Sequence, residues 1–185
     1  GVAPADAVLL GEWASPSITA LVEQTNRPSD NFAAETLLKA LGAEFGTAGT
    51  TAGGTSVARE VAAGFDAHPQ MVDGSGLSRR NHTTPRDVVE LLAGMDASDV
   101  GDELRDSLAV AGRTGTLSKR MRRNAARGRC NAKTGTLNGV STLAGFCEAR
   151  SGARTAFAFL MNGVTVWGAH PLQDRMAGAL ARYRP

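Results

Sequence analysis

The feature that most constrains the fold is a two-residue turn between two apolar runs in the second half of the chain. Asn138 and Gly139 separate residues 130–136 from residues 140–148, and both tolerate the positive φ that a tight hairpin turn requires. Because a two-residue loop fixes the pairing of the strands beside it, the turn predicts an antiparallel hairpin in one defined register.

That register makes the two cysteines of the chain face each other. Cys130 and Cys147 fall opposite one another as a non-hydrogen-bonded pair, where side chains come closest, so we expect a cross-strand disulfide. A bulge that shifts the register would leave two reduced core thiols instead. A disulfide would indicate an oxidising, extracytoplasmic setting. Neither cysteine has the spacing of a metal ligand, so we expect no metal and no cofactor.

Periodicity divides the chain into a helical and a sheet-forming part of one domain. We expect residues 1–128 to be mostly helical and residues 129–185 to hold the hairpin, a third strand and a final helix. The helices are expected at 18–26, 31–45, 56–65, 85–95 and 171–183, and the third strand at 155–162. Residues 49–54 (GTTAGG) are expected to form a flexible connection.

Composition favours a globular domain, because 42% of the 185 residues are apolar. Aromatic residues make up 5%, which disfavours a surface on which nucleobases stack. No apolar run reaches the ~20 residues of a membrane helix. The first residues, GVAPADAVLLGEW, lack the basic segment of a signal peptide. We therefore expect a soluble chain that is either mature or truncated.

The charge is distributed unevenly along the chain. The formal net charge is +2, yet residues 107–147 carry eight lysines and arginines and no aspartate or glutamate. A local positive field of this kind attracts anions, either nucleic-acid phosphates or a substrate carboxylate. A solvated basic face is the simpler alternative.

Three short patterns could carry chemistry: Ser29-Asp30-Asn31 before a helix, Lys133-Thr134-Gly135-Thr136 on the first hairpin strand, and residues 73–79 (DGSGLSR). Each has an ordinary structural interpretation when taken alone. The first could simply cap the following helix. The third could be a turn, and a lone Lys-Thr-Gly carries little information.

The order and surroundings of these patterns resemble the class C low-molecular-mass penicillin-binding proteins, D-alanyl-D-alanine carboxypeptidases of the penicillin-binding protein 4 type. The blocks that resemble the family span most of the chain; they are residues 29–38, 72–85, 115–121 and 132–145. The resemblance implies an α/β (α+β) fold of the serine β-lactamase and transpeptidase type, with an antiparallel sheet flanked by a helical subdomain. It also implies a serine-type acyl-enzyme mechanism that β-lactams inhibit.

The resemblance assigns roles to the residues of these motifs. It implies that Ser29 relays a proton to the leaving amine and that Asn31 binds the substrate amide and orients a catalytic lysine. Lys133 would supply a fixed positive charge. The hydroxyls of Thr134 and Thr136 would bind the terminal carboxylate, the Thr136 N–H would form half of an oxyanion hole, and Gly135 would let the substrate lie flat. Positions near the pocket for the peptide side chain are Arg79, Leu137 and Asn138.

One motif of the family is absent from these 185 residues. The lysines are Lys39, Lys119 and Lys133, and three places before them stand Thr36, Thr116 and Cys130, so there is no Ser-x-x-Lys nucleophile motif. We expect that the chain is the C-terminal part of a penicillin-binding domain, and that it is inactive without an upstream segment.

Two other functions stay open at this point. A non-catalytic module that binds peptidoglycan or β-lactams would lack the nucleophile throughout the protein. A basic nucleic-acid binder would show a steep salt dependence of DNA affinity. We favour the enzyme, whose partners would be peptidoglycan stem peptides ending in D-Ala-D-Ala and β-lactam antibiotics, with no nucleic acid and no transmembrane segment.

Overall fold

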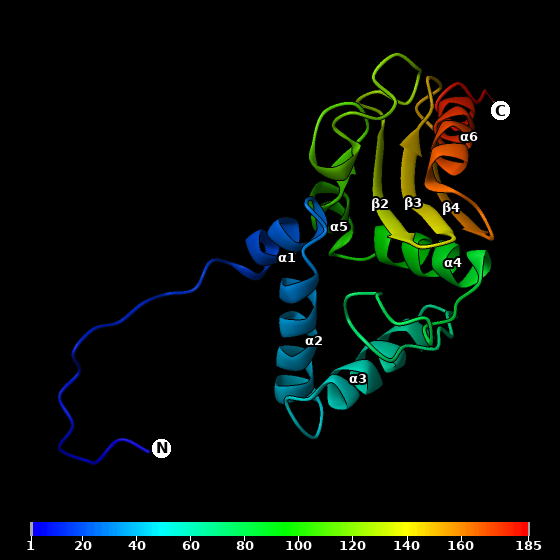
Figure 1. Cartoon of the computed structure of the whole chain (residues 1–185). Coiled ribbons are helices and arrows are strands. Elements are labelled where there is room, and N and C mark those ends of the chain that lie inside the picture. Colours follow the sequence, from blue (N-terminus) through cyan, green and yellow to red (C-terminus); the bar gives the residue numbers. More distant parts are fainter. Residues whose placement is uncertain (1, 185) are drawn as a thin grey trace.

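A computed structural model describes residues 2–184 as an antiparallel sheet with helices on both faces and a helical lobe beside it (Figure 1). The helices are α1 (Ile18–Asn26), α2 (Asn31–Phe45), α3 (Thr51–Ala63), α4 (Pro85–Asp96), α5 (Gly101–Ser107) and α6 (Val166–Leu180), with a 3-10 turn at Gly115–Leu117. The strands are β1 (Ala109–Val110), β2 (Cys130–Leu137), β3 (Val140–Glu148) and β4 (Arg154–Asn162). This mixed architecture confirms the predicted fold class.

The four strands form one antiparallel sheet in the order β1-β2-β3-β4. The hairpin has the register that its turn predicts, with Leu137 opposite Val140 and Cys130 opposite Cys147. The strand β1 pairs with β2 only at Asn131 and Ala132. Beyond Ala132, the β1-side edge of β2 therefore carries no neighbouring strand within the part of the chain that the structure describes.

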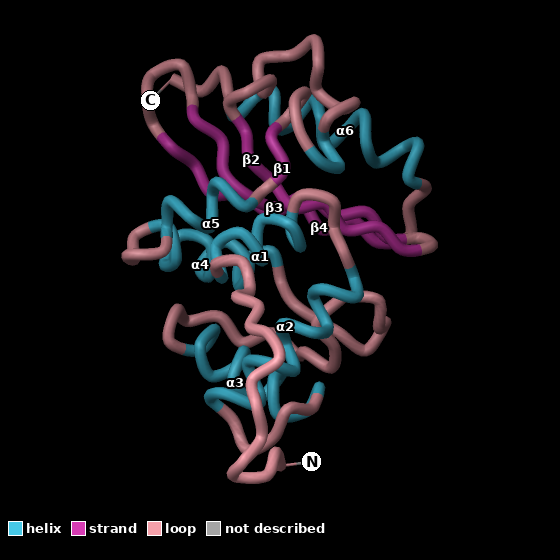
Figure 2. The backbone as a smooth tube through the Cα atoms, turned by 90° about the vertical axis from the view of Figure 1, so that its left-hand side faces the viewer, coloured by secondary structure: helices cyan, strands magenta, loops and turns pink. Residues whose placement is uncertain are grey.

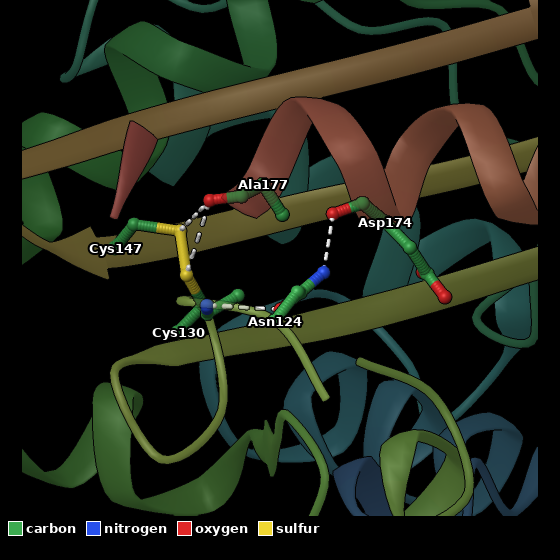
Figure 3. Close-up of a disulfide and its surroundings, with 6 residues drawn as sticks. Asn124, Cys130, Cys147, Asp174 and Ala177 are labelled. Atoms are coloured by element: carbon green, nitrogen blue, oxygen red, sulfur yellow. Dashed lines mark hydrogen bonds between the residues drawn. A yellow bond between two sulfur atoms is a disulfide. The ribbon is translucent and has the colours of Figure 1, made fainter. Parts of the chain in front are cut away.

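The main core lies between one face of the sheet, the loop 111–126 and α6. Leu117, Leu143 and Ala177 are fully buried there. A disulfide of 2.06 Å joins Cys130 to Cys147 beneath α6, and both sulfurs lie 3.9 Å from the Ala177 carbonyl oxygen (Figure 3). Figure 2 shows α4, α5 and α1 on the opposite side of the sheet from α6, above the lobe that contains α2 and α3.

Two elements begin earlier than the sequence predicts. The segment expected to be flexible, 49–54, contains the start of α3, because Thr50 caps this helix by accepting a hydrogen bond from Gly53 N at 3.0 Å. Gly54 packs so closely against α2 that a Cβ there would lie 1.9 Å from the Leu38 carbonyl oxygen. The glycine is thus required for helix packing rather than for flexibility.

The final helix also starts before its predicted first residue. Thr165 caps α6 by accepting a hydrogen bond from Gly168 N, which leaves Pro171 inside the helix instead of in its first turn. The short elements α5 and β1 were not predicted, because seven and two residues are too few for a periodic pattern. In the described part of the chain, no helix combines the length and apolarity needed to cross a bilayer.

Candidate active site

A cavity of about 510 Å³ separates the edge of β2 from the start of α2. Its walls come from segments that are far apart in the sequence, so folding alone brings the three predicted motifs together. The lining residues are Ser29, Asn31, Gly74, Ser75, Gly76, Leu77, Thr116, Lys133, Thr134, Gly135, Thr136, Leu137, Val140 and Thr142.

The first wall is the turn that joins α1 to α2. Asp30 caps α2 by accepting a hydrogen bond from Ala33 N at 2.9 Å, so α2 begins at Asn31. Ser29 has a φ of 63°, a left-handed conformation that is uncommon for a residue with a side chain. The three residues of this motif therefore have separate roles. Asp30 caps the helix, while Ser29 and Asn31 line the cavity.

The second wall is β2, and Lys133 reaches across from it to the first wall. Lys133 Nζ donates a hydrogen bond to Ser29 Oγ at 2.5 Å, joining residues 104 positions apart, and a second one to the Thr134 carbonyl at 3.0 Å. Burial lowers the pKa of the Lys133 ammonium below that of an ordinary lysine. Among residues 2–184, no carboxylate lines this cavity, so an anionic ligand would meet an unopposed positive charge.

Lys133 and Thr134 both line the cavity although side chains alternate along a strand. The explanation is the free edge of β2, which exposes backbone and side chains from both faces. Thr134 Oγ1 donates to Thr116 Oγ1 at 2.9 Å, and the Thr116 N–H is bonded to the Arg27 carbonyl oxygen at 3.1 Å. Thr116 therefore bridges the two walls. Its position in a motif block was visible in the sequence, but no role was inferred for it.

The hairpin register also determines which backbone groups face the cavity. Leu137–Val140 closes a two-residue hairpin and is a hydrogen-bonded pair, so alternate residues of β2, including Lys133 and Gly135, direct their N–H and C=O groups toward β3. The backbone groups of Thr134 and Thr136 consequently point toward the free edge. A peptide bound there would meet a donor N–H at Thr136.

The third wall is the loop 73–79, which is fixed by a glutamate of α2. Glu35 Oε1 accepts hydrogen bonds from Gly74 N at 3.0 Å, Ser75 N at 2.9 Å and Ser75 Oγ at 2.8 Å. Burial raises the pKa of Glu35, but these hydrogen bonds outweigh it and lower the pKa below its ordinary value. The loop is thus a structured wall and more than a simple turn, and the cavity-lining positions of Ser75 and Gly76 were not predicted.

Three further predicted positions lie at the hairpin end. Arg79 Nη2 donates to the Asn138 carbonyl at 2.6 Å, tying the loop to the turn. Arg79 and Leu137 line an adjoining cavity of about 510 Å³ that shares Lys133 with the first. Leu137 lines both cavities, whereas Asn138 lines neither and contributes its backbone carbonyl. No group of metal-ligating side chains occurs among the described residues.

Comparison with known proteins identifies the family to which the chain is similar. The profile of the D-Ala-D-Ala carboxypeptidase 3 (S13) family matches residues 1–183. A D-alanyl-D-alanine carboxypeptidase of Actinomadura sp. is 36% identical over 186 residues, which is 96% of this chain and 34% of that protein. The matches to this carboxypeptidase and four other curated relatives cover between 20% and 39% of each relative's length.

Solved structures show the same fold. The crystal structure of penicillin binding protein 4 from Haemophilus influenzae superimposes with a TM-score of 0.79 at 26% identity, covering 89% of this chain and 40% of that one. The TLA-3 extended-spectrum beta-lactamase matches with a TM-score of 0.66 at 16% identity over 90% of this chain and 64% of that one, a likeness of fold. These matches confirm the resemblance inferred from the motifs: the chain belongs to the D-Ala-D-Ala carboxypeptidase 3 (S13) family.

Proposed function

We propose that this chain forms the substrate-binding and proton-relay walls of a serine-type D-Ala-D-Ala carboxypeptidase or endopeptidase that remodels peptidoglycan. The observation that carries the proposal is the hydrogen bond between Lys133 Nζ and Ser29 Oγ across a cavity without carboxylates. A positive charge, several hydroxyls and a free strand edge suit a peptide that ends in a carboxylate.

In this proposal the terminal carboxylate is anchored on β2. Lys133 supplies the charge, while the hydroxyls of Thr134 and Thr136 donate hydrogen bonds to the carboxylate oxygens. Gly135 has no side chain to hold the substrate away from the strand. The Thr136 N–H, at the free edge of β2, is one donor of the oxyanion hole.

The chemical steps require a nucleophilic serine with its base lysine, the Ser-x-x-Lys pattern that these 185 residues do not contain. That serine adds to the penultimate carbonyl carbon, its proton passes to the base, and the oxyanion is held at Thr136. Collapse of the tetrahedral intermediate breaks the peptide bond. Ser29 then relays a proton to the departing amine of the terminal D-alanine, and water hydrolyses the acyl-enzyme.

The remaining residues bind and position groups. The side-chain amide of Asn31, at the start of α2, donates a hydrogen bond to the substrate's amide carbonyl. Its oxygen accepts one from the base lysine, which helps to orient that lysine. Arg79 and Leu137 border the adjoining cavity, which receives the side chain of the stem peptide, and the Asn138 carbonyl holds Arg79 there. A β-lactam would enter the same site as a substrate analogue and acylate the same serine.

The substrate and the disulfide both suggest where the protein works. Peptidoglycan lies outside the cytoplasmic membrane, and the buried Cys130–Cys147 bond is typical of proteins in oxidising compartments. We therefore place the protein in an extracytoplasmic location.

Fluorescent penicillin labelling of the intact protein that contains this chain tests the proposal. Ser29→Ala and Lys133→Ala are each expected to slow acylation by about 100-fold or more, because a proton relay contributes about 10²–10⁴-fold. Ser56→Ala on α3 and Lys39→Ala on α2 remove the same side chains from exposed positions and serve as matched controls. Labelling at the normal rate in both cleft variants would refute the proposal.

A non-catalytic module that binds peptidoglycan or β-lactams is the second candidate, because the same cavity would bind the peptide without any covalent step. The two functions differ in the bond that penicillin forms. An enzyme retains the label after denaturation, because an acyl-serine is covalent. A binding module releases all label on denaturation, although Lys133→Ala still weakens its affinity.

A further inference from the structure

A third cavity lies at the other end of β2, outside the candidate active site and the cavity that adjoins it. It has a volume of about 380 Å³. We call it the arginine pocket, and its lining residues are Arg113, Arg127, Gly128, Arg129, Asn131 and Glu148. The three guanidinium-bearing side chains come from the loop 111–129, at the end of the sheet opposite the hairpin turn (Figure 1).

The arginines of this pocket are not neutralised by the protein. Arg113, Arg127 and Arg129 are exposed, and within residues 2–184 none of them forms an ion pair with a carboxylate. Glu148 is the one acidic residue in the lining, and it too makes no such pair in the described chain. The lining therefore holds three positive charges against one negative charge.

The loop that carries these arginines is anchored on the sheet and α6. Its backbone joins the sheet through Ala111 N to the Cys130 carbonyl and Gly128 N to the Ala111 carbonyl, both at 2.9 Å. Arg120 pairs with Asp174 of α6 at 2.6 Å. Asn124 Nδ2 also donates to the Asp174 carbonyl at 2.8 Å, as Figure 3 shows. The three arginine side chains therefore project from a backbone that is anchored to both the sheet and α6.

One guanidinium lies directly over a glycine of the loop. Gly128 has a φ of +69°, and a Cβ at this position would lie 2.6 Å from Cζ of Arg113. Any other residue at position 128 would therefore displace the Arg113 side chain. A planar guanidinium can present two N–H donors to one phosphate.

We propose that the arginine pocket binds the phosphates of a phosphodiester polymer that carries no nucleobases. Arginine favours phosphate because its fork of donors matches the phosphate oxygens. Proteins that bind single-stranded nucleic acid commonly stack its bases on aromatic side chains, and no aromatic residue lines this pocket in the described chain. A polymer of alternating phosphates and polyols has no bases to stack.

The arginine pocket lies close enough to the candidate active site for one bound polymer to reach both. Asn131 lines the pocket and Lys133 lines the cleft on the same strand. At a strand rise of about 3.3 Å per residue, the two positions are ~7 Å apart. A wall polymer held at the arginine pocket would therefore lie beside a substrate bound at β2. The binding claim itself does not depend on the proposed catalytic function.

Binding of a fluorescent glycerol-phosphate oligomer to the intact protein that contains this chain tests this inference, measured by anisotropy over a range of salt concentrations. Arg127→Gln and Arg129→Gln are each expected to weaken binding about tenfold, the worth of one charge-assisted hydrogen bond. Each is also expected to reduce the slope of log affinity against log salt by about one. Glu148→Gln should tighten binding about threefold by removing the opposing charge.

Arg59→Gln on α3 is the matched control, because it removes an exposed arginine outside the pocket and should leave affinity unchanged. Two competitors identify the source of the phosphate. Inorganic phosphate that competes as well as the oligomer would overturn the assignment to a polymer. A single-stranded DNA oligomer that binds more tightly would overturn the exclusion of nucleobases, and equal affinity of wild type and both pocket variants would overturn the site itself.

Discussion

The sheet with its C-terminal helix and the N-terminal helices differ in how completely they bury their apolar side chains. Leu117, Leu143 and Phe157, from the loop, β3 and β4, are 0–4% exposed. In contrast, Leu10, Trp13 and several apolar residues of α1 to α3 are more than half exposed within the described chain. The candidate cleft therefore has one wall that is supported by a closed core and another wall with much less support.

Because of this difference, the two walls of the cleft are held in place by different kinds of interaction. The β2 wall is fixed by the register, the disulfide and the packing of α6. The Ser29 wall depends on a few specific polar contacts instead, such as the bond from Thr116 N to the Arg27 carbonyl. Stability should therefore be concentrated in the sheet, and the polar contacts of the helical wall should affect the site more than the global fold.

The largest predicted effect comes from truncating a core residue of the sheet. Leu143→Ala should lower the free energy of unfolding by about 2–5 kcal/mol, because the side chain is fully buried and leaves a cavity. Phe32→Ala, at an 82% exposed position of α2, should change it by less than about 0.5 kcal/mol. Urea unfolding of both variants measures the contrast. Equal losses would remove the distinction between the two regions.

The disulfide should contribute next to the stability of the sheet. Replacing Cys130 and Cys147 together by alanine should cost about 3 kcal/mol, since the bond closes a loop with a sequence separation of 17 residues. Thermal unfolding of the double variant, compared with that of the unmodified chain with and without reductant, measures the contribution. An unchanged midpoint in both comparisons would show that the packing of α6 alone fixes β2.

A polar contact of the helical wall should have a smaller and more local effect. Glu35→Ala removes the acceptor of three hydrogen bonds from Gly74 and Ser75 and should cost about 1 kcal/mol, because Glu35 is partly open to solvent. Amide exchange in the loop 73–79 should accelerate, while exchange in β3 stays constant. Glu60→Ala, an exposed residue of α3, is the matched control.

The pH dependence of that contact has a defined sign. The pKa of Glu35 is lowered in the folded chain, so its contribution is complete above the ordinary value of 4.5 and is lost as the pH falls through the lowered pKa. Protection factors in the loop 73–79, which are corrected for the intrinsic pH dependence of amide exchange, should therefore fall below pH 4.5 in the unmodified chain. The same acid-induced loss of protection in Glu35→Ala would assign it to another group.

The smallest predicted effect is a shift of the alkaline side of the pH profile for penicillin acylation, caused by Lys133 on the β2 wall. Burial lowers the pKa of Lys133, so its ammonium is lost below the ordinary value of 10.5 and penicillin acylation of the intact protein should decline there. Between the lowered pKa and 10.5 the unfolded chain holds the extra proton, so stability rises with pH in that window. Lys133→Arg should remove both effects, and an alkaline limb that persists in this variant would contradict the assignment.

The sequence predicts the sheet wall better than the helical wall, for a physical reason. A two-residue Asn-Gly turn permits one register, so the facing positions of Cys130 and Cys147 follow from local geometry. The first turn of α3 depends on the Thr50 cap and also on the contact of Gly54 with Leu38, and no local pattern contains the second of these. Tertiary packing overrides the low helix propensity of two adjacent glycines there.

The same reason separates the site residues that were predicted from those that were missed. Ser29, Asn31 and Lys133 belong to motifs that carry meaning through their order along the chain. Thr116 and Ser75 line the cavity because the 3-10 turn and the loop 73–79 pack beside it. Such positions require the folded chain. A third residue, Thr142, could have been found from the register, which pairs it with Gly135.

The most direct measurement is a crystal structure of the protein with a bound peptide that ends in D-alanyl-D-alanine. The proposed function predicts the terminal carboxylate between Lys133 Nζ and the hydroxyls of Thr134 and Thr136, with Ser29 Oγ still within hydrogen-bonding distance of Lys133 Nζ. Ser29 and Lys133 in separate solvent-filled regions, or a peptide carboxylate bound away from β2, would contradict it.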